Sequence, residues 1–178
     1  MRAYLFTLLF TLTFLATSAQ RTKTGPVLDD YGAVFPVPEL DVTIGKNEKL
    51  KALFEINRQF DDRDKPNPLI ESAARYLNLH AQNNIPTSQQ AVVLIIHGGG
   101  VYDLLNNDAY RKKYGISNPN AELIAELHDL GVRVVVCGQS AANRNLTKAV
   151  ALPEVEFALS AMTALVKFQN DQYRLIKF

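Results

Sequence analysis

Two runs of apolar, mostly β-branched residues constrain the fold of this chain more than any other feature. Residues Val92 to Ile96 are continuously apolar, which is typical of a strand buried on both faces of a parallel sheet. Residues Val132 to Val136 predict a second buried strand. Between them, apolar residues recur at helical spacing until Gly131, which is expected to end the helix. Strand, helix and strand in this order predict an α/β fold with a mostly parallel sheet.

Further elements extend this pattern on both sides. Residues 51 to 56 predict a first strand, and Asn67-Pro68 predicts a helix start with Asn as N-cap and Pro at the first helical position. Asn118-Pro119 repeats that signal. A short helix is expected near residues 103 to 113, then a short strand from Val155, a helix over about 160 to 170 and an edge strand over 173 to 177. We therefore expect a five-stranded sheet.

The N-terminal residues predict a targeting segment. Arg2 precedes an uncharged apolar run, and Thr17-Ser18-Ala19 places small residues before the expected cleavage at Gln20. The run is too short for a comfortable membrane span, so no stable membrane anchor is expected. We thus divide the chain into a signal peptide (1–19), an N-terminal arm (20–48) and an α/β domain (49–178), and we expect a periplasmic or secreted protein.

Charge and composition exclude several classes of function. The net charge is +1 and the pI is about 7.8, which gives no electrostatic signature of a nucleic-acid-binding protein. Three histidines and one cysteine form no structural zinc pattern. We expect neither a metal nor an organic cofactor.

Cys137 is the only cysteine, and it directly follows the second buried run. Gly138, Gln139 and Ser140 then begin a turn into a predicted helix. A helix N-terminus favours a thiolate over a thiol, and ligand sites in open α/β sheets lie beyond the carboxyl ends of the strands. A buried free cysteine can equally act as a small hydrophobic residue. From its position in the sequence, Cys137 can therefore be either a reactive thiol or a structural residue.

The first buried run ends in His97, Gly98, Gly99 and Gly100. Glycines let the backbone approach a ligand closely, and the N–H groups of such a turn can bind an anion. A histidine there could act as an acid or a base near neutral pH. The alternative is a tight turn beside a capping histidine. Because parallel strands end at the same edge, His97 and Cys137 are expected to share one end of the sheet.

With these residues in view, the chain from about Lys49 to Phe178 resembles the DsrE/DsrF-like family. The landmarks are His97-Gly98-Gly99, Asn118-Pro119-Asn120, the segment from Val136 to Ser140, and residues 160 to 173. Residues Cys137 to Arg144 also resemble the cysteine segment of the TusD sulfur-relay subunit. The resemblance implies a three-layer α/β/α sandwich, a homo-oligomer (a trimer or hexamer) and a persulfide-carrying role for Cys137. It adds Asn118 and Arg144 to the candidate binding residues.

Two functions follow from this reading. The first is an exported sulfur carrier or sulfurtransferase that acts through Cys137 and exchanges sulfur with a thiol-bearing partner protein. Gln139, Ser140 and backbone N–H groups would then hold the anion, and His97 would assist proton movement. The second is a non-catalytic module for small-ligand binding or assembly, in which Cys137 is structural. Accessibility of the thiol in the native protein distinguishes the two.

Overall fold

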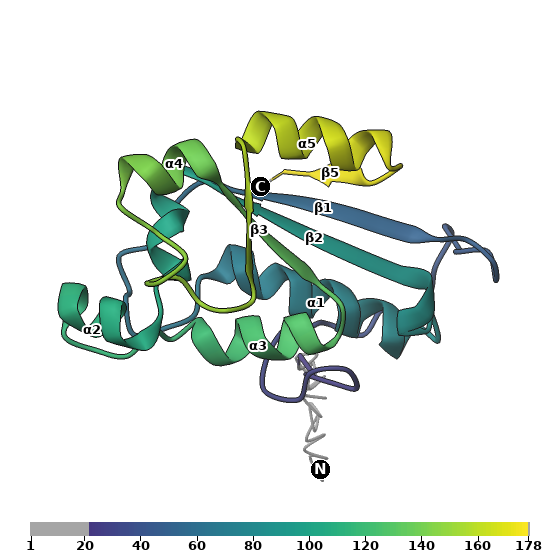
Figure 1. The fold of residues 1–178 in the computed structure, drawn as a ribbon. Coiled ribbons are helices and arrows are strands. Elements are labelled where there is room, and N and C mark those ends of the chain that lie inside the picture. Colours follow the sequence, from purple (N-terminus) through teal and green to yellow (C-terminus); the bar gives the residue numbers. More distant parts are fainter. Residues whose placement is uncertain (1–21, 178) are drawn as a thin grey trace, which may run out of the picture.

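The computed structural model describes residues 22–177, which form one α/β unit (Figure 1). Its five strands form a single sheet in the order β4-β3-β2-β1-β5, and every neighbouring pair is parallel. The elements are β1 (Leu50–Ile56), α1 (Pro68–Gln82), the 3-10 helix η1 (Thr87–Gln89), β2 (Gln90–Ile96), the 3-10 helix η2 (Gly98–Leu104), α2 (Asn107–Tyr114), α3 (Ala121–Asp129), β3 (Arg133–Cys137), α4 (Gly138–Asn143), β4 (Val155–Ala158), α5 (Ala161–Asn170) and β5 (Arg174–Ile176). The predicted α/β sandwich with a five-stranded parallel sheet is confirmed.

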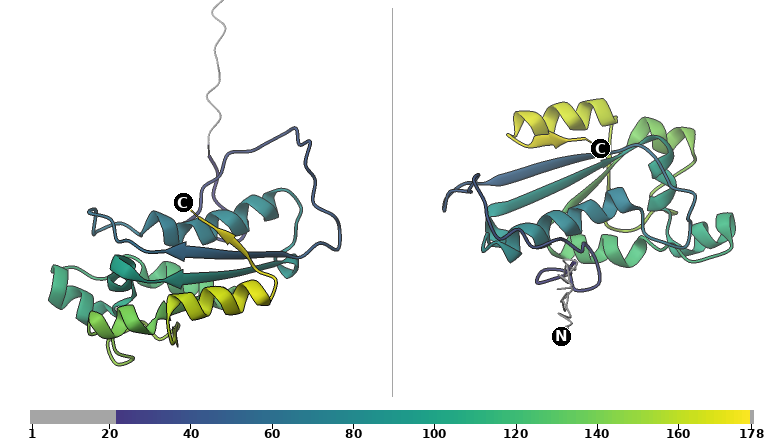
Figure 2. Two further views of the ribbon diagram at one scale, coloured as in Figure 1. Left: turned by 90° about the horizontal axis from the view of Figure 1, so that it is seen from above. Right: turned by 180° about the vertical axis from the view of Figure 1, so that it is seen from behind.

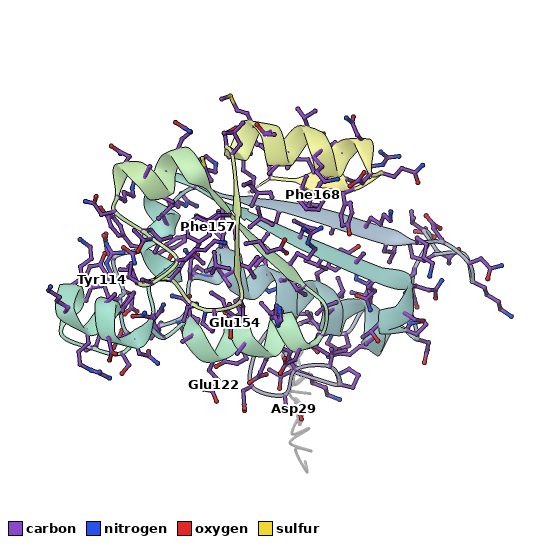
Figure 3. All side chains as sticks on the ribbon, viewed as in Figure 1. Asp29, Tyr114, Glu122, Glu154, Phe157 and Phe168 are labelled. Atoms are coloured by element: carbon purple, nitrogen blue, oxygen red, sulfur yellow. The ribbon has the colours of Figure 1, made fainter. Side chains whose placement is uncertain are left out.

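Helices cover the sheet on both faces and so create three layers. Helices α1 and α3 lie below the sheet and α5 lies above it (Figures 1 and 2). The lower interface holds the larger apolar cluster, which includes Ile96, Leu127 and Val136. The upper interface is smaller and includes Cys137 and Phe168, and Figure 3 shows Phe168 between α5 and the sheet. Alternate residues of β2 and β3 enter opposite clusters, which explains why both runs are apolar except at the exposed Arg133.

The two Asn-Pro signals have different outcomes. The prediction at Asn67 is confirmed, because α1 begins at Pro68 and the Asn67 side chain accepts a hydrogen bond from the Leu69 N–H group at 2.9 Å. The prediction at Asn118 is wrong by two residues, since α3 begins at Ala121. Asn118 instead accepts from the Asn120 N–H group at 2.9 Å and forms a local turn that delays the helix.

The segment after Gly100 also starts its helix later than expected. The chain first forms η2, and α2 begins only at Asn107. Asn106 caps α2 by accepting a hydrogen bond from the Ala109 N–H group at 2.9 Å, and Gly115 ends it with φ of 82°. The predicted helix therefore exists, but the first residues predicted for it belong to η2, the 3-10 helix that begins at Gly98.

The N-terminal arm packs on α1 through a buried asparagine. The amide oxygen of Asn78 accepts hydrogen bonds from the N–H groups of Val27 and Leu28, both at 3.0 Å. Its amide nitrogen donates to the carbonyls of Leu28 and Tyr31 at 2.9 and 2.8 Å. The Leu28 side chain enters the lower core and is 1% exposed. The arm is thus joined to the domain of its own chain.

Within residues 22–177, no helix has the length and apolar character needed to cross a membrane. The predicted signal peptide, residues 1–19, lies outside the described residues, as does the expected cleavage at Gln20.

Candidate thiol site

The carboxyl ends of all five strands meet at one edge of the sheet, beside α4 and η2 (Figure 1). Cys137 ends β3, and α4 begins at the next residue. A Cβ atom on Gly138 would lie 2.5 Å from the carbonyl oxygen of Ala158 and 3.1 Å from that of Leu159. Only glycine therefore allows the chain to turn here, because the segment after β4 lies directly against it.

The environment of Cys137 contains opposing influences on the thiol. The residue is only 6% exposed and lies in the upper apolar cluster. Burial alone raises the thiol pKa, but hydrogen-bonding groups of Ser140 (side chain and backbone), Ala161 and Gln139 more than offset it and lower the pKa below the ordinary value. The thiol makes no regular capping hydrogen bond to α4. The surrounding donors favour the thiolate, as expected for a nucleophilic cysteine.

A hydrogen bond joins the thiol turn to the glycine turn. The Gly98 N–H group donates to the Ser140 hydroxyl oxygen at 3.2 Å. The hydroxyl proton then remains available for the sulfur of Cys137, and donation to the hydroxyl strengthens it as a donor. Gly98 has φ of +53°, and an added Cβ atom would lie 2.4 Å from the Asn57 carbonyl oxygen. The glycine turn thus holds Ser140 in place through the backbone.

His97 faces a carboxylate that the sequence analysis did not identify. Its Nε2 atom lies 3.1 Å from Oε1 of Glu55, and the ammonium group of Lys177 lies 3.1 Å from Oε2 of the same residue. Burial raises the pKa of Glu55, but hydrogen bonds with Lys177 and His97 outweigh it, so the net pKa is lowered. His97 is therefore held by Glu55, and the groups that favour the Cys137 thiolate come from elsewhere. The signal available in the sequence was a charged residue, Glu55, next to the carboxyl end of the first strand.

The other candidate binding residues, Gln139, Gly99, Arg144 and Asn118, make contacts of different kinds. Gln139 is exposed, and its backbone N–H group helps to lower the pKa of Cys137. Gly99 donates its N–H group to the Asn57 carbonyl at 2.9 Å. Arg144, at the end of α4, lies with Cζ 5.9 Å from the Tyr102 ring. Asn118 is buried, and its amide nitrogen donates to the carbonyls of Asp103 and Leu105, so it supports the turn before α3.

A buried acid was also missed by the sequence analysis. Asp103 is 2% exposed, and its two oxygens accept hydrogen bonds from Gln59 at 2.6 Å and Asn67 at 2.7 Å. Burial raises its pKa to about 6, although these hydrogen bonds and the charge of Arg63 act in the opposite direction. Asp103 fixes the loop between β1 and α1 against η2.

The described residues include no cluster of side chains that would form a metal site. Among residues 22–177, no group of three or more His, Cys, Asp or Glu side chains is arranged to hold a metal ion.

Comparison with known proteins places this arrangement in a family. The model of the DsrE/DsrF-like family matches residues 54–178, and the chain belongs to that family. Among solved structures, the chain is similar to a protein of unknown function, MTH1491 from Methanobacterium thermoautotrophicum. The TM-score is 0.56 at 16% sequence identity, covering 73% of this chain and 100% of that chain. This similarity shows the shared fold. A search of the curated proteins found no significant match.

Proposed function

We propose that this protein is an exported sulfur carrier or sulfurtransferase that holds persulfide sulfur on Cys137. The observation that carries the proposal is the set of donors around a nearly buried thiol, which lowers its pKa despite burial. The family is associated with sulfur relay, and the cysteine lies at the carboxyl edge of the sheet, where ligands bind in open α/β folds.

The reaction is thiol–persulfide exchange and is redox-neutral overall. The Cys137 thiolate attacks the outer sulfur of a sulfane-sulfur donor, a bond forms between the two sulfur atoms, and the donor leaves as its own anion. A partner protein's thiolate then attacks the outer sulfur of the Cys137 persulfide, and Cys137 leaves as thiolate. Ser140 and the backbone N–H groups of Gln139 and Ala161 would stabilise the anion at both stages.

His97 has a secondary place in this proposal. Its hydrogen bond to Glu55 orients the imidazole at the same edge of the sheet, where a proton released by an incoming thiol could be accepted. The Lys177 ammonium group keeps Glu55 ionised. The three groups form a supporting array, and Cys137 with Ser140 forms the reacting centre.

The second candidate function is a non-catalytic binding or assembly module, and the low exposure of Cys137 favours it. A thiol that is 6% exposed and packed against Ala161 can serve as an apolar core residue. In that case the glycine turns shape the fold, and the protein acts through its surfaces as a homo-oligomer.

The pH dependence of iodoacetamide alkylation of the native protein tests the proposal, with Cys137→Ser as the blank. A free cysteine titrates near 8.5, and we expect a midpoint below about 7.5. Ser140→Ala should raise the midpoint, because it removes one donor to the thiolate. His97→Ala should leave it nearly unchanged. A midpoint at or above 8.5, or no labelling without denaturant, would favour the binding module.

A further inference from the structure

A hollow of about 400 Å³ lies next to the glycine turn, in the size range of small-molecule sites. Its walls come from three segments, namely the loop after β1, η2 and α2. The lining residues are Asn57, Arg58, Gln59, Arg63, Gly99, Tyr102, Lys113 and Tyr114. The hollow lies at the carboxyl edge of the sheet, and Figure 3 shows Tyr114 at that end of the molecule.

The charges on this lining have one sign. Arg58, Arg63 and Lys113 line the hollow, and no carboxylate does. In the part of the chain that the structure describes, Arg58 and Lys113 have no carboxylate within ion-pair distance, and each lies over an aromatic ring. The whole chain carries a net charge of only +1, so this concentration of cations is local.

Arg63 has unused hydrogen-bonding capacity. Its Nη1 atom is buried and has no hydrogen-bond partner within residues 22–177. Its other terminal nitrogen lies 4.0 Å from Asp61, whose side chain is fully exposed. Nη1 itself does not reach the hollow, but the Arg63 side chain is 32% exposed, and a bound anion would accept a charge-assisted hydrogen bond from the accessible part of the guanidinium.

Aromatic rings and a buried network hold these cations in place. The Lys113 ammonium group lies 4.3 Å from the Tyr102 ring centroid, and Arg63 lies 5.5 Å from that of Tyr114. The Tyr114 hydroxyl donates to Gln59 at 2.9 Å, and Gln59 in turn donates to the buried Asp103. Hydrogen bonds to buried residues thus hold the side chains that line the hollow, as a binding site requires.

The hollow is connected to the thiol turn. Tyr102 also faces Arg144, which follows α4, the helix that begins after Cys137. Gly99 lines the hollow, while its neighbour Gly98 donates to Ser140 beside the thiol. One short backbone segment therefore borders both places.

We propose that this cationic hollow binds the anionic group of a small sulfur compound that donates sulfur to the protein or accepts it. The binding of an anion stands on the geometry alone. The assignment of that anion to a sulfur compound rests on the proposed function of Cys137. Arg63 supplies the directed hydrogen bonds, and Arg58 and Lys113 add charge.

Titration calorimetry of the full protein with thiosulfate, and separately with sulfate, at low ionic strength tests the proposal. We expect Arg63→Gln to weaken binding about tenfold or more, because a charge-assisted hydrogen bond is lost. Lys113→Gln should weaken it severalfold. Lys112→Gln, on the same helix but outside the hollow, is the matched control and should leave binding within about twofold.

Absence of binding of both anions, or equal losses in Lys112→Gln and Lys113→Gln, would overturn the proposal. If Arg63→Gln fails to fold, the comparison of the two lysine variants decides. Cys137→Ser should bind thiosulfate like the wild type. Anion binding with an unreactive Cys137 would refute the proposed function and keep the site, whereas a reactive Cys137 without anion binding would refute only the site.

Discussion

Replacing the buried Asp103 by Asn should remove a large pH dependence of stability. Burial raises the pKa of this carboxyl from 3.8 to about 6. At 1.36 kcal/mol per pKa unit, this difference corresponds to about 3 kcal/mol. The folded state holds the proton more tightly than the unfolded state, so this stabilisation is complete below pH 4 and is lost as the pH rises to about 6.

The assay is urea unfolding of the wild type and Asp103→Asn from pH 3.5 to 7.5. The free energy of unfolding of the wild type, minus that of the variant, should fall by about 3 kcal/mol over this range. Asn cannot accept from both Gln59 and Asn67, which adds a constant loss of about 1 kcal/mol at every pH. Asp61→Asn, at an exposed carboxylate of the loop between β1 and α1, is the control and should change stability little.

A difference that stays flat or rises with pH would refute this reasoning. A flat difference would mean that Arg63 and the two amide donors fully offset the penalty of burial, and a rising one that they outweigh it.

Three further predictions concern the arm, the assembly and the N-terminus. Asn78→Ala should lower the free energy of unfolding by about 3 kcal/mol in urea, because it leaves buried N–H and carbonyl groups of the arm unpaired, and an unchanged value would contradict the described docking. Sedimentation at micromolar concentration should show a trimer or hexamer, and a clean monomer would remove that proposal. N-terminal sequencing of the protein from its native host should begin at Gln20, and an intact Met1 would exclude the predicted processing.

Apolar residues of the N-terminal arm and of the loop after Gly100 predict that one of these two segments lies in the oligomer interface. Three apolar residues of these segments, Leu28, Val101 and Leu104, belong to the core of the chain's own fold. Large apolar side chains remain exposed at Val42 of the arm (83%) and at Met162 of α5 (76%). We therefore propose that these two segments contribute to an oligomer interface.

The sheet could be predicted because its signals are local. After their first residues, Gln90 and Arg133, β2 and β3 are apolar at every position, which is typical of strands buried on both faces. Asn67-Pro68 correctly predicted the start of α1. The start of α3 could not be predicted in the same way. Asn118 forms hydrogen bonds to carbonyls of Asp103 and Leu105, and these partners lie in an irregular segment whose path no periodicity reveals.

The site was only partly predictable for a similar reason. Cys137, Ser140 and Gly98 lie at strand ends, so the parallel topology brings them together. The pairing of His97 with Glu55 depends on which side chains of adjacent strands face each other at their ends, and Lys177 joins them only because β5 lies beside β1. Such contacts depend on register and on strand order, which the sequence does not state.

Persulfide loading followed by intact-mass measurement tests the central claim most directly. The native protein is incubated with a sulfane-sulfur donor and separated from excess donor, and its intact mass is then measured. Cys137→Ser is the matched control. The account predicts a gain of one sulfur atom on the wild type, no gain on the variant, and loss of that sulfur when a small thiol is added. A wild type that gains no sulfur while folded would contradict the account, and Cys137 would then be a structural residue of a binding or assembly module.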